Sequence, residues 1–376
     1  MDQGQTLRIV YVGWVGFGNL GDDVCRNLFT DHIGRSAFAL GRDCVILTAT
    51  HQGISEQSLL EFRPHLVVLG AGSLFTPAYL QPLLVAQKHG IPTATWGTGF
   101  DRLSRPSLDA LLETKAPLPL WKNERDAEPF RWAVDTCTWA GVRGPHTLKI
   151  LESAGCASPH LHISGDPGLL LQPGDAPEPL EPRLQSWIND RAPIVAVNWG
   201  TANNHVYGGD ECMVAAALSQ VIEQLSRDSY KVLLFSVWGP DLAPMRKLAA
   251  PFDDDPNVVA LRQVPSGPAL AWILKRCRFS INFKLHANVF TAAVGRPFIS
   301  LAYRSKCYDF AASVGCDDLV VRFDRPDLSE AVLDTCDLIE QNRKALKARI
   351  RNHARRYTKR LNTLIEKMAA VGRENA

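Results

Sequence analysis

Hydrophobic residues fall in short runs along the whole chain, and amphipathic stretches separate the runs. The runs are rich in β-branched residues and largely unalternated, which is typical of strands buried on both faces of a sheet. Nine of them are predicted as strands: residues 7–12, 44–48, 66–69, 92–96, 194–198, 231–237, 257–261, 278–282 and 297–301. Helical periodicity falls between them, for example at residues 79–89, 211–226 and 267–276.

Strand and helix in alternation predict βαβ units, and therefore mostly parallel, doubly wound sheets. A chain of 376 residues exceeds the usual size of one hydrophobic core, so we expect two domains. Residues 172–185 are rich in proline and acid and carry no apolar period, as in a linker. The sequence thus predicts Rossmann-like domains at 1–172 and 193–327, a linker at 173–192, and a basic helical segment at 328–376.

The composition is that of an ordinary globular protein, with 46% hydrophobic and 21% charged residues. A net charge of +2 gives no global electrostatic case for binding nucleic acid. The nine cysteines form no C-x-x-C pair, which predicts reduced thiols and no zinc site. The first residues lack the features of a signal peptide, and no apolar run reaches the roughly 18 residues needed to cross a bilayer. We therefore expect a cytoplasmic protein.

The last segment is continuously compatible with a helix and strongly basic. Nine lysine and arginine residues lie between positions 343 and 360, and no acid occurs from 341 to 365. One interpretation is a solvated helix that packs across both domains. The other is a basic helix that makes a peripheral contact with anionic lipid at the inner face of the membrane, or with a charged acceptor.

Several strands end in residues suited to ligand binding, since parallel sheets bind ligands beyond the carboxyl ends of their strands. Trp-Gly pairs at Trp96, Trp199 and Trp238 either cap the core or offer flat faces for sugars. A glycine-rich turn at residues 13–21 precedes a helix starting near Asp22, and a second glycine turn spans 69–75. Such turns can bind anions through backbone N–H groups, although the single G-x-G-x-x-G match is unspecific.

Two further places combine cations with the start of a helix. Lys284 and His286 lie where a strand runs into a helix, between apolar neighbours. Arg143 lies just before Pro145, which can start a helix running to about Ser153. An arginine at such a position is either an anion clamp or half of a structural ion pair.

The segments NLGDD, GAGSLF, VRGPHTLKIL, SGDPGLL and INFKLHANVFTAAVGRPFISLAYRSK occur in this order between about residues 9 and 315. In order and spacing the chain resembles the polysaccharide pyruvyl transferases. The resemblance implies two Rossmann-like domains facing a cleft, as in GT-B glycosyltransferases. It also implies transfer of the pyruvyl group of phosphoenolpyruvate to two sugar hydroxyls, which makes a pyruvate ketal and releases phosphate.

The resemblance implies a donor site in the second domain and an acceptor side in the first. Its catalytic residues would be His286, Arg143 and Lys306. Donor contacts would come from Arg143, Lys284, Leu285, His286 and Lys306. Acceptor contacts are predicted at Asn19, Asp22, Gly72, Ser73, Trp96, Asn203, Asn204 and His205. Phosphoenolpyruvate would be a substrate, the acceptor a saccharide or a lipid-linked saccharide, and neither a cofactor nor a metal is expected.

The chain departs from the family pattern in two places. Lys284 stands where the family usually has arginine, so a point charge replaces a planar two-pronged clamp. Thr76 and Pro77 follow the second glycine turn, where the family often has an acid. Two alternatives stay open because a fold does not fix a function. One is a GT-B glycosyltransferase with a nucleotide-sugar donor, its base held at Trp238 or Trp272, and the other is a non-catalytic saccharide-binding homologue.

Overall fold

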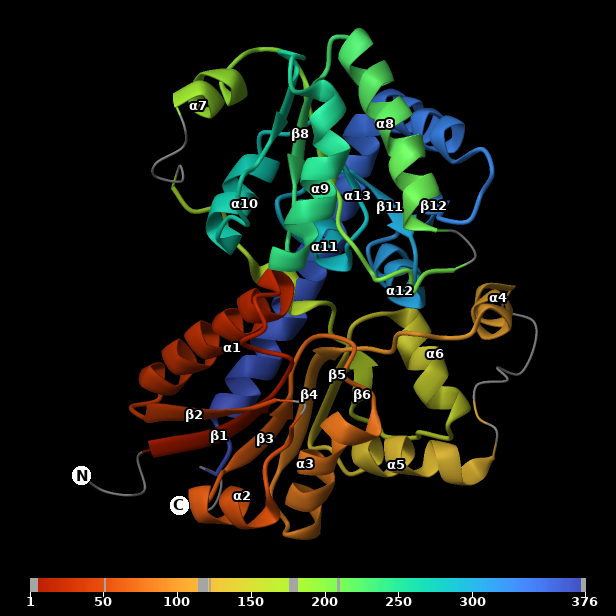
Figure 1. Cartoon of the computed structure of the whole chain (residues 1–376). Coiled ribbons are helices and arrows are strands. Elements are labelled where there is room, and N and C mark those ends of the chain that lie inside the picture. The colour runs from red at the N-terminus through yellow and green to blue at the C-terminus, as the bar shows by residue number, and fades with distance from the viewer. Residues whose placement is uncertain are drawn as a thin grey trace. The chain divides into compact units, whose positions relative to one another are not determined.

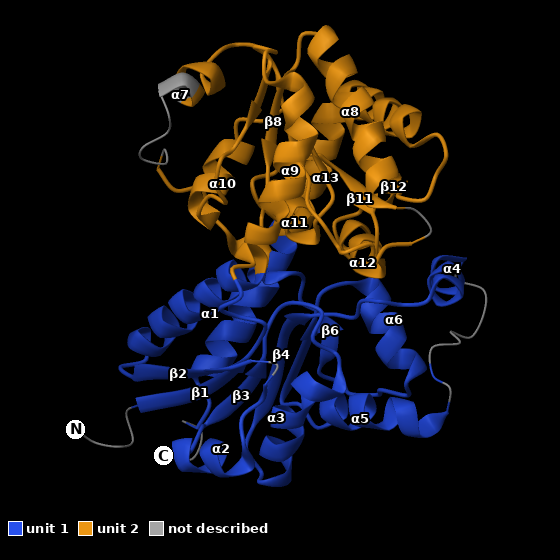
Figure 2. Cartoon of the chain, in the orientation of Figure 1, with its two compact units in different colours: residues 1–17, 22–167, 355–376 blue, residues 18–21, 168–354 orange. Residues whose placement is uncertain are grey.

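The computed structural model describes residues 6–50, 52–113, 121, 123–175, 182–207 and 210–372. These residues form two compact units, each built on one sheet (Figure 1). Unit 1 contains residues 1–17, 22–167 and 355–376, and unit 2 contains residues 18–21 and 168–354 (Figure 2). The chain therefore passes from unit 1 to unit 2 and back at residues 18–21, and again near residues 168 and 355.

Unit 1 has a six-stranded sheet whose strand pairs are all parallel, in the order β2-β1-β3-β4-β5-β6. Its strands are β1 (Thr6–Val12), β2 (Asp43–Ala49), β3 (Leu66–Leu69), β4 (Thr93–Thr98), β5 (Trp139–Val142) and β6 (Leu161–Ile163). All residues of β3 and β4 are buried, in agreement with their unalternated apolar sequences. The direction of winding changes between β1 and β3, and the carboxyl ends of these two strands mark the expected ligand position.

Helices connect these strands in unit 1. They are α1 (Leu20–Ala39), α2 (Glu56–Phe62), α3 (Pro77–Lys88), α4 (Arg105–Glu113), α5 (Glu124–Asp135) and α6 (Pro145–Ser153). Side chains that accept hydrogen bonds from the first turn define two of the starts, Ser55 at α2 and Asn123 at α5. The predicted helix from Pro145 to Ser153 is confirmed with the same limits.

Unit 2 has a second all-parallel sheet, in the order β12-β11-β10-β7-β8-β9. Its strands are β7 (Ile194–Asn198), β8 (Lys231–Phe235), β9 (Val258–Ala260), β10 (Phe279–Asn282), β11 (Phe298–Ala302) and β12 (Val320–Arg322). Its helices are α7 (Pro182–Ile188), α8 (Glu211–Arg227), α9 (Leu242–Ala249), α10 (Gly267–Leu274), α11 (Leu285–Ala293) and α12 (Ser305–Ser313). Here the winding changes direction between β7 and β10, as in the dinucleotide-binding strand order.

The final helix, α13 (Leu328–Ala369), confirms the prediction of one long helix. Its residues up to 354 belong to unit 2 and those from 355 onward to unit 1. The predicted linker at 173–192 includes α7, and its residues 176–181 lie outside the described part of the chain. No helix in the described ranges is long and apolar enough to cross a membrane.

Candidate active site

The loops that follow β7 and β10 meet at the point in unit 2 where the winding changes direction. Asn198, the last residue of β7, accepts a hydrogen bond on Oδ1 from the backbone N–H of Lys284 at 2.9 Å. Its Nδ2 donates to the carbonyl of Phe235 at 3.1 Å, so one buried amide connects the ends of three strands. This connection fixes Lys284 as the residue that caps the start of α11.

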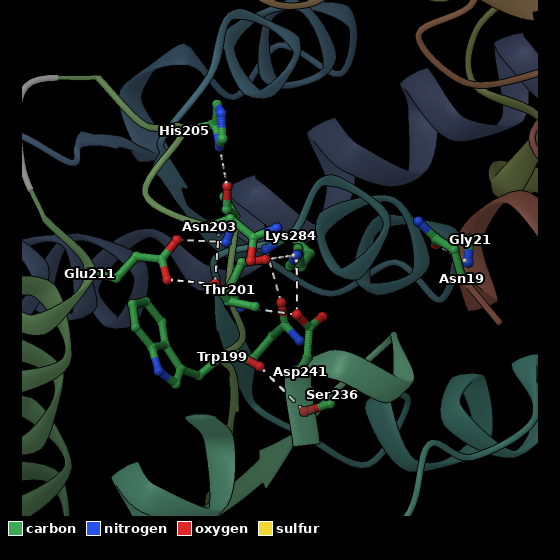
Figure 3. Close-up of polar contacts among 12 residues, drawn as sticks. Asn19, Gly21, Trp199, Thr201, Asn203, His205, Glu211, Ser236, Asp241 and Lys284 are labelled. Carbon is green, nitrogen blue, oxygen red and sulfur yellow. Dashed lines mark hydrogen bonds and ion pairs between the residues drawn. The ribbon is translucent and has the colours of Figure 1, made fainter. Parts of the chain in front are cut away.

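The ammonium of Lys284 points back toward the loop after β7 (Figure 3). It donates to the carbonyl of Thr201 at 2.5 Å and lies 3.2 Å from Oδ1 of Asp241, which is completely buried. Burial lowers the pKa of Lys284 and raises the pKa of Asp241, and in each case the partner's charge opposes the shift. The predicted donor lysine is thus half of a buried ion pair within unit 2.

The loop after β7 carries three of the predicted acceptor residues in unit 2. Asn203, Asn204 and His205 are all exposed. Asn203 and Asn204 have left-handed φ angles of 54° and 55°, which asparagine tolerates better than most residues. Glu211, at the start of α8, holds the loop because its carboxylate accepts from the hydroxyl of Thr201 at 2.7 Å and from the N–H of Asn204 at 3.0 Å (Figure 3).

Two more cations follow β11, the strand beside β10. Arg304 and Lys306 are partly exposed at the start of α12. The Nε of Arg304 donates to the carbonyl of His205 at 3.0 Å, and the ammonium of Lys306 lies 5.5 Å from the ring centre of Tyr303. Their positive charges add to the effect of burial in lowering the pKa of Lys284, so both charges lie close enough to Lys284 to repel its ammonium. This cationic group, Lys284, Arg304 and Lys306, lies beside the first turns of α11 and α12, whose N–H groups also favour anions.

His286 lies in the first turn of α11 and is only 8% exposed. Its ring stacks on Phe290 with centres 5.9 Å apart. A Cβ atom added to Gly21 would lie 1.9 Å from its Nδ1, so the absence of a side chain at position 21 makes room for the imidazole. Asn19 shapes this turn, because its Oδ1 accepts from the N–H of Gly21 at 3.0 Å. Residues 18–21 thus belong to the immediate surroundings of His286.

In unit 1, predicted residues gather where the winding changes direction, beyond β1 and β3. Asp22 is 7% exposed, and a Cβ on Gly72 would approach its Oδ1 to 3.1 Å. Gly72 has a φ of 116°, a conformation that other residues rarely adopt, and Ser73 beside it is partly exposed. Arg143 follows β5 and is completely buried, with its Nη2 donating to the carbonyl of Phe100 at 3.0 Å.

The three Trp-Gly pairs do not share one environment. Trp96 is completely buried and packs against Phe29, with ring centres 5.2 Å apart. Trp96 therefore has no exposed face, which overturns the expectation that its indole stacks on a sugar. Trp199 is also buried, against Phe283, whereas Trp238 is partly exposed and lies 5.3 Å from the ammonium of Lys284.

An aromatic pair that the sequence analysis missed lies in the turn after β1. Trp14 and Phe17 are 39% and 41% exposed, and their ring centres are 5.8 Å apart. The turn is held at Gly16, whose N–H donates to Oδ1 of Asp23 at 3.0 Å. The signal was the alternation of aromatic residues with glycines in GWVGFG, which exposes large rings on a tight turn.

Asp241, Glu211 and Arg304 were also missed. Asp241 lies three residues after Trp238 of the third Trp-Gly pair, and Arg304 lies within the segment INFKLHANVFTAAVGRPFISLAYRSK. Glu211 gave no signal beyond its place at a helix start. Asp241 and Glu211 hold a lysine and a loop in place, and such contacts are revealed only by the spatial neighbours of a residue.

Three solved structures resemble the chain in fold at low sequence identity. The Staphylococcus aureus MnaA structure with UDP is 9% identical, with a TM-score of 0.61 over 93% of this chain and 92% of that one. A putative UDP-N-acetylglucosamine 2-epimerase from Listeria monocytogenes is 10% identical, with a TM-score of 0.59 over 92% and 90%. The Glycyrrhiza uralensis glycosyltransferase UGT73P12, complexed with glycyrrhetinic acid 3-O-monoglucuronide, is 10% identical, with a TM-score of 0.59 over 98% and 97%. At such identities the likeness shows the fold alone, and it confirms the predicted GT-B-like class of two Rossmann-like domains.

No curated protein matches the sequence. The family model described as polysaccharide pyruvyl transferase, however, matches residues 23–305. This range covers most of both sheets, the glycine turn after β3, and the segment that contains Lys284, His286 and Arg304. The chain therefore belongs to the polysaccharide pyruvyl transferase family.

Proposed function

We propose that the protein transfers the pyruvyl group of phosphoenolpyruvate to two hydroxyls of a sugar in a polysaccharide or lipid-linked saccharide. The products are a pyruvate ketal and phosphate. The observation that carries this proposal is the cationic group of Lys284, Arg304 and Lys306 at the carboxyl ends of β10 and β11. Phosphoenolpyruvate has a carboxylate and a phosphate, and several cations beside two helix N-termini suit both anions.

Within this group the cations have different tasks. The charge of Lys284 is compensated by Asp241 and its ammonium is bound to Thr201, so it orients the loop after β7. Arg304 and Lys306 are more exposed, and they are the proposed direct contacts of the donor's anionic groups. Arg143 of unit 1, the remaining cation of the prediction, is kept as a proposed donor contact.

The reaction requires proton transfer at two kinds of atom. The methylene carbon of the enolpyruvyl group takes up one proton, and the neighbouring carbon binds the first sugar hydroxyl. The C–O bond to phosphate then breaks, and the second hydroxyl adds at the same carbon. The two hydroxyls release two protons, of which one is retained in the new methyl group and one leaves with hydrogen phosphate. His286 is the proposed acid and base, because an imidazole can do either task near neutral pH.

The acceptor is proposed to contact exposed groups at the carboxyl edges of the sheets. Asn203, Asn204 and His205 offer amide and imidazole groups in unit 2. In unit 1 we propose the Trp14 and Phe17 rings in place of the buried Trp96, since sugars stack on exposed aromatic faces. Asp22, Gly72 and Ser73 are retained as proposed polar contacts, and Asn19 is assigned to the turn that carries Gly21.

A thermal shift experiment tests the donor. Phosphoenolpyruvate should raise the melting temperature of the wild-type protein, and the rivals UDP and GDP should not. Lys306→Ala should lose this shift, whereas His286→Ala should keep it and lose turnover.

Stabilisation by a nucleotide alone would instead favour the glycosyltransferase alternative. The face of Trp272, which was predicted to stack on the nucleotide base, is already covered, because the guanidinium of Arg276 lies 3.3 Å from the centre of the indole ring. Ligand binding without turnover in the wild type would favour the non-catalytic homologue.

A further inference from the structure

Unit 1 contains a basic pocket away from the strand ends described above. It has a volume of about 520 Å³ and lies between the last turns of α13 and the region of β5 and β6. Four cations and two histidines line it: Arg356, Lys359, Arg360, Lys367, His160 and His162. Among the described residues that form its wall, none is acidic.

The cations come from one side of the helix. Arg356, Arg360 and Lys367 are spaced by four and seven residues, which places them on one face, and Lys359 lies beside Arg360. All four are exposed, so their charges meet both solvent and the pocket. Four like charges around one cavity repel one another, and an anion in the cavity would relieve this repulsion.

Neutral groups hold the arginines in place. Arg360 donates from Nη1 to the carbonyl of Ile163 at 2.7 Å, and its guanidinium lies 5.8 Å from the ring centre of Tyr357. Arg356 donates from Nη2 to the hydroxyl of Tyr357 at 3.0 Å and lies 4.8 Å from the same ring. A carbonyl and a phenol therefore orient the two guanidinium groups.

The last turns of α13 pack closely against β5 and the turn after β6. A Cβ on Gly141 of β5 would lie 2.7 Å from Leu364, and a Cβ on Gly165 would lie 2.5 Å from Cβ of Tyr357. Gly165 also has a φ of 90°, so the chain requires glycine there on two grounds. Trp139 and Leu364 add an apolar side to the cationic wall.

We propose that this pocket binds a phosphate-bearing ligand, with a diphosphate as the group that best matches four cations, two of them oriented arginines. Arginine forks and lysine ammonium groups are the usual protein contacts of phosphate. The apolar side at Trp139 and Leu364 suits a carbon portion attached to the phosphates. Such a group can come from a soluble compound or from the head group of a lipid, and both sources present the same chemistry. This site uses none of the residues assigned to pyruvyl transfer.

Hydrogen–deuterium exchange with inorganic pyrophosphate tests the soluble source. Pyrophosphate should slow exchange in peptides covering residues 159–163 and 356–367, and added salt should weaken the effect. The variant Lys359→Ala/Lys367→Ala should bind about 25-fold more weakly in this titration, since each basic residue contributes roughly a factor of five near a phosphate surface. The matched control is Lys344→Ala/Arg355→Ala, which removes the same charge from exposed positions of α13 outside the pocket.

Vesicle sedimentation tests the lipid source with the same proteins. Binding to phosphatidylcholine vesicles that contain phosphatidylglycerol, but not to phosphatidylcholine alone, and its loss in the pocket variant would assign the ligand to a lipid. Protection by pyrophosphate without vesicle binding would assign it to a soluble phosphate compound. The proposal is overturned if pyrophosphate does not protect the two peptides and the protein does not bind the phosphatidylglycerol vesicles. It is also overturned if the control variant weakens binding as much as the pocket variant, because the effect is then only net charge.

Discussion

The imidazole of His286 fills the space that a side chain at position 21 would need, with its Nδ1 only 1.9 Å from the place of a Cβ on Gly21. The glycine turn after β1 is therefore shaped to admit the proposed acid–base residue. Loops of this type are usually explained by phosphate binding. Here glycine is also needed for a steric reason, because the ring of His286, which is far away in the sequence, occupies the space of a side chain at position 21.

Gly21→Ala should displace the His286 ring and reduce turnover by about 10²-fold, within the usual range for general acid–base catalysis. Binding of phosphoenolpyruvate should change much less, because Lys306 and Arg304 are untouched. Steady-state kinetics and a thermal shift with the donor measure the two effects. Gly34→Ala in α1 is the control, since a Cβ there has nothing within 4 Å. Equal activity of both variants would refute the steric argument.

The buried pair of Lys284 and Asp241 should show strong coupling in unfolding experiments. Lys284→Ala leaves the completely buried Asp241 carboxylate without its cation, and we expect a loss of about 3 kcal/mol in the free energy of unfolding. The double variant with Asp241→Ala should lose less than the sum of the two single variants. The wild type, the two single variants and the double variant form a double-mutant cycle, and urea unfolding with a probe in unit 2 measures their free energies of unfolding. Additive losses would show that the pair does not interact.

The aromatic pair in the turn after β1 should affect the acceptor and not the donor. Trp14→Ala and Phe17→Ala are each expected to raise the KM for the saccharide by roughly threefold to tenfold, the value of one stacking contact. The KM for phosphoenolpyruvate should stay within a factor of two, or about 0.4 kcal/mol. Trp132→Ala is a matched control, because Trp132 is 43% exposed on α5 and lies outside this turn. An unchanged acceptor KM in both turn variants would remove them from the acceptor site.

His65 should make unit 1 less stable in mild acid. Its Nδ1 accepts a hydrogen bond from the backbone N–H of Arg8 at 2.9 Å, and burial lowers the pKa of the imidazole below 6.5. The unfolded chain then binds the proton more readily, so this contribution to stability is present above pH 6.5 and is lost as the pH falls through the folded pKa. The difference in melting temperature between pH 7.5 and about pH 5.5 should be smaller in His65→Gln. A His65 pKa above 6.5 by NMR titration would contradict this explanation.

The sequence predicted most of the fold because nine strands carry unalternated apolar runs. The three strands it missed are short and contain glycine or polar residues: Gly141 in β5, His162 in β6 and Arg322 in β12. Lys284 and His286 could be found because they interrupt an apolar strand–helix junction. Asp241 and Gly21, which determine the surroundings of these two residues, could not be assigned, since their contacts depend on the packing of distant segments.

The division of α13 between the two units has a consequence for how the protein is made. Unit 1 is completed by residues 355–372, which bury Tyr357, Leu361, Leu364 and Ile365 and receive hydrogen bonds from Arg42 at the carbonyls of Ala369 and Val371. Its first strand is synthesised early, but residues 355–372 are synthesised only after residues 168–354 of unit 2. Unit 1 therefore cannot complete its core until residues 355–372 have been synthesised, and until then the apolar surface that they cover stays open.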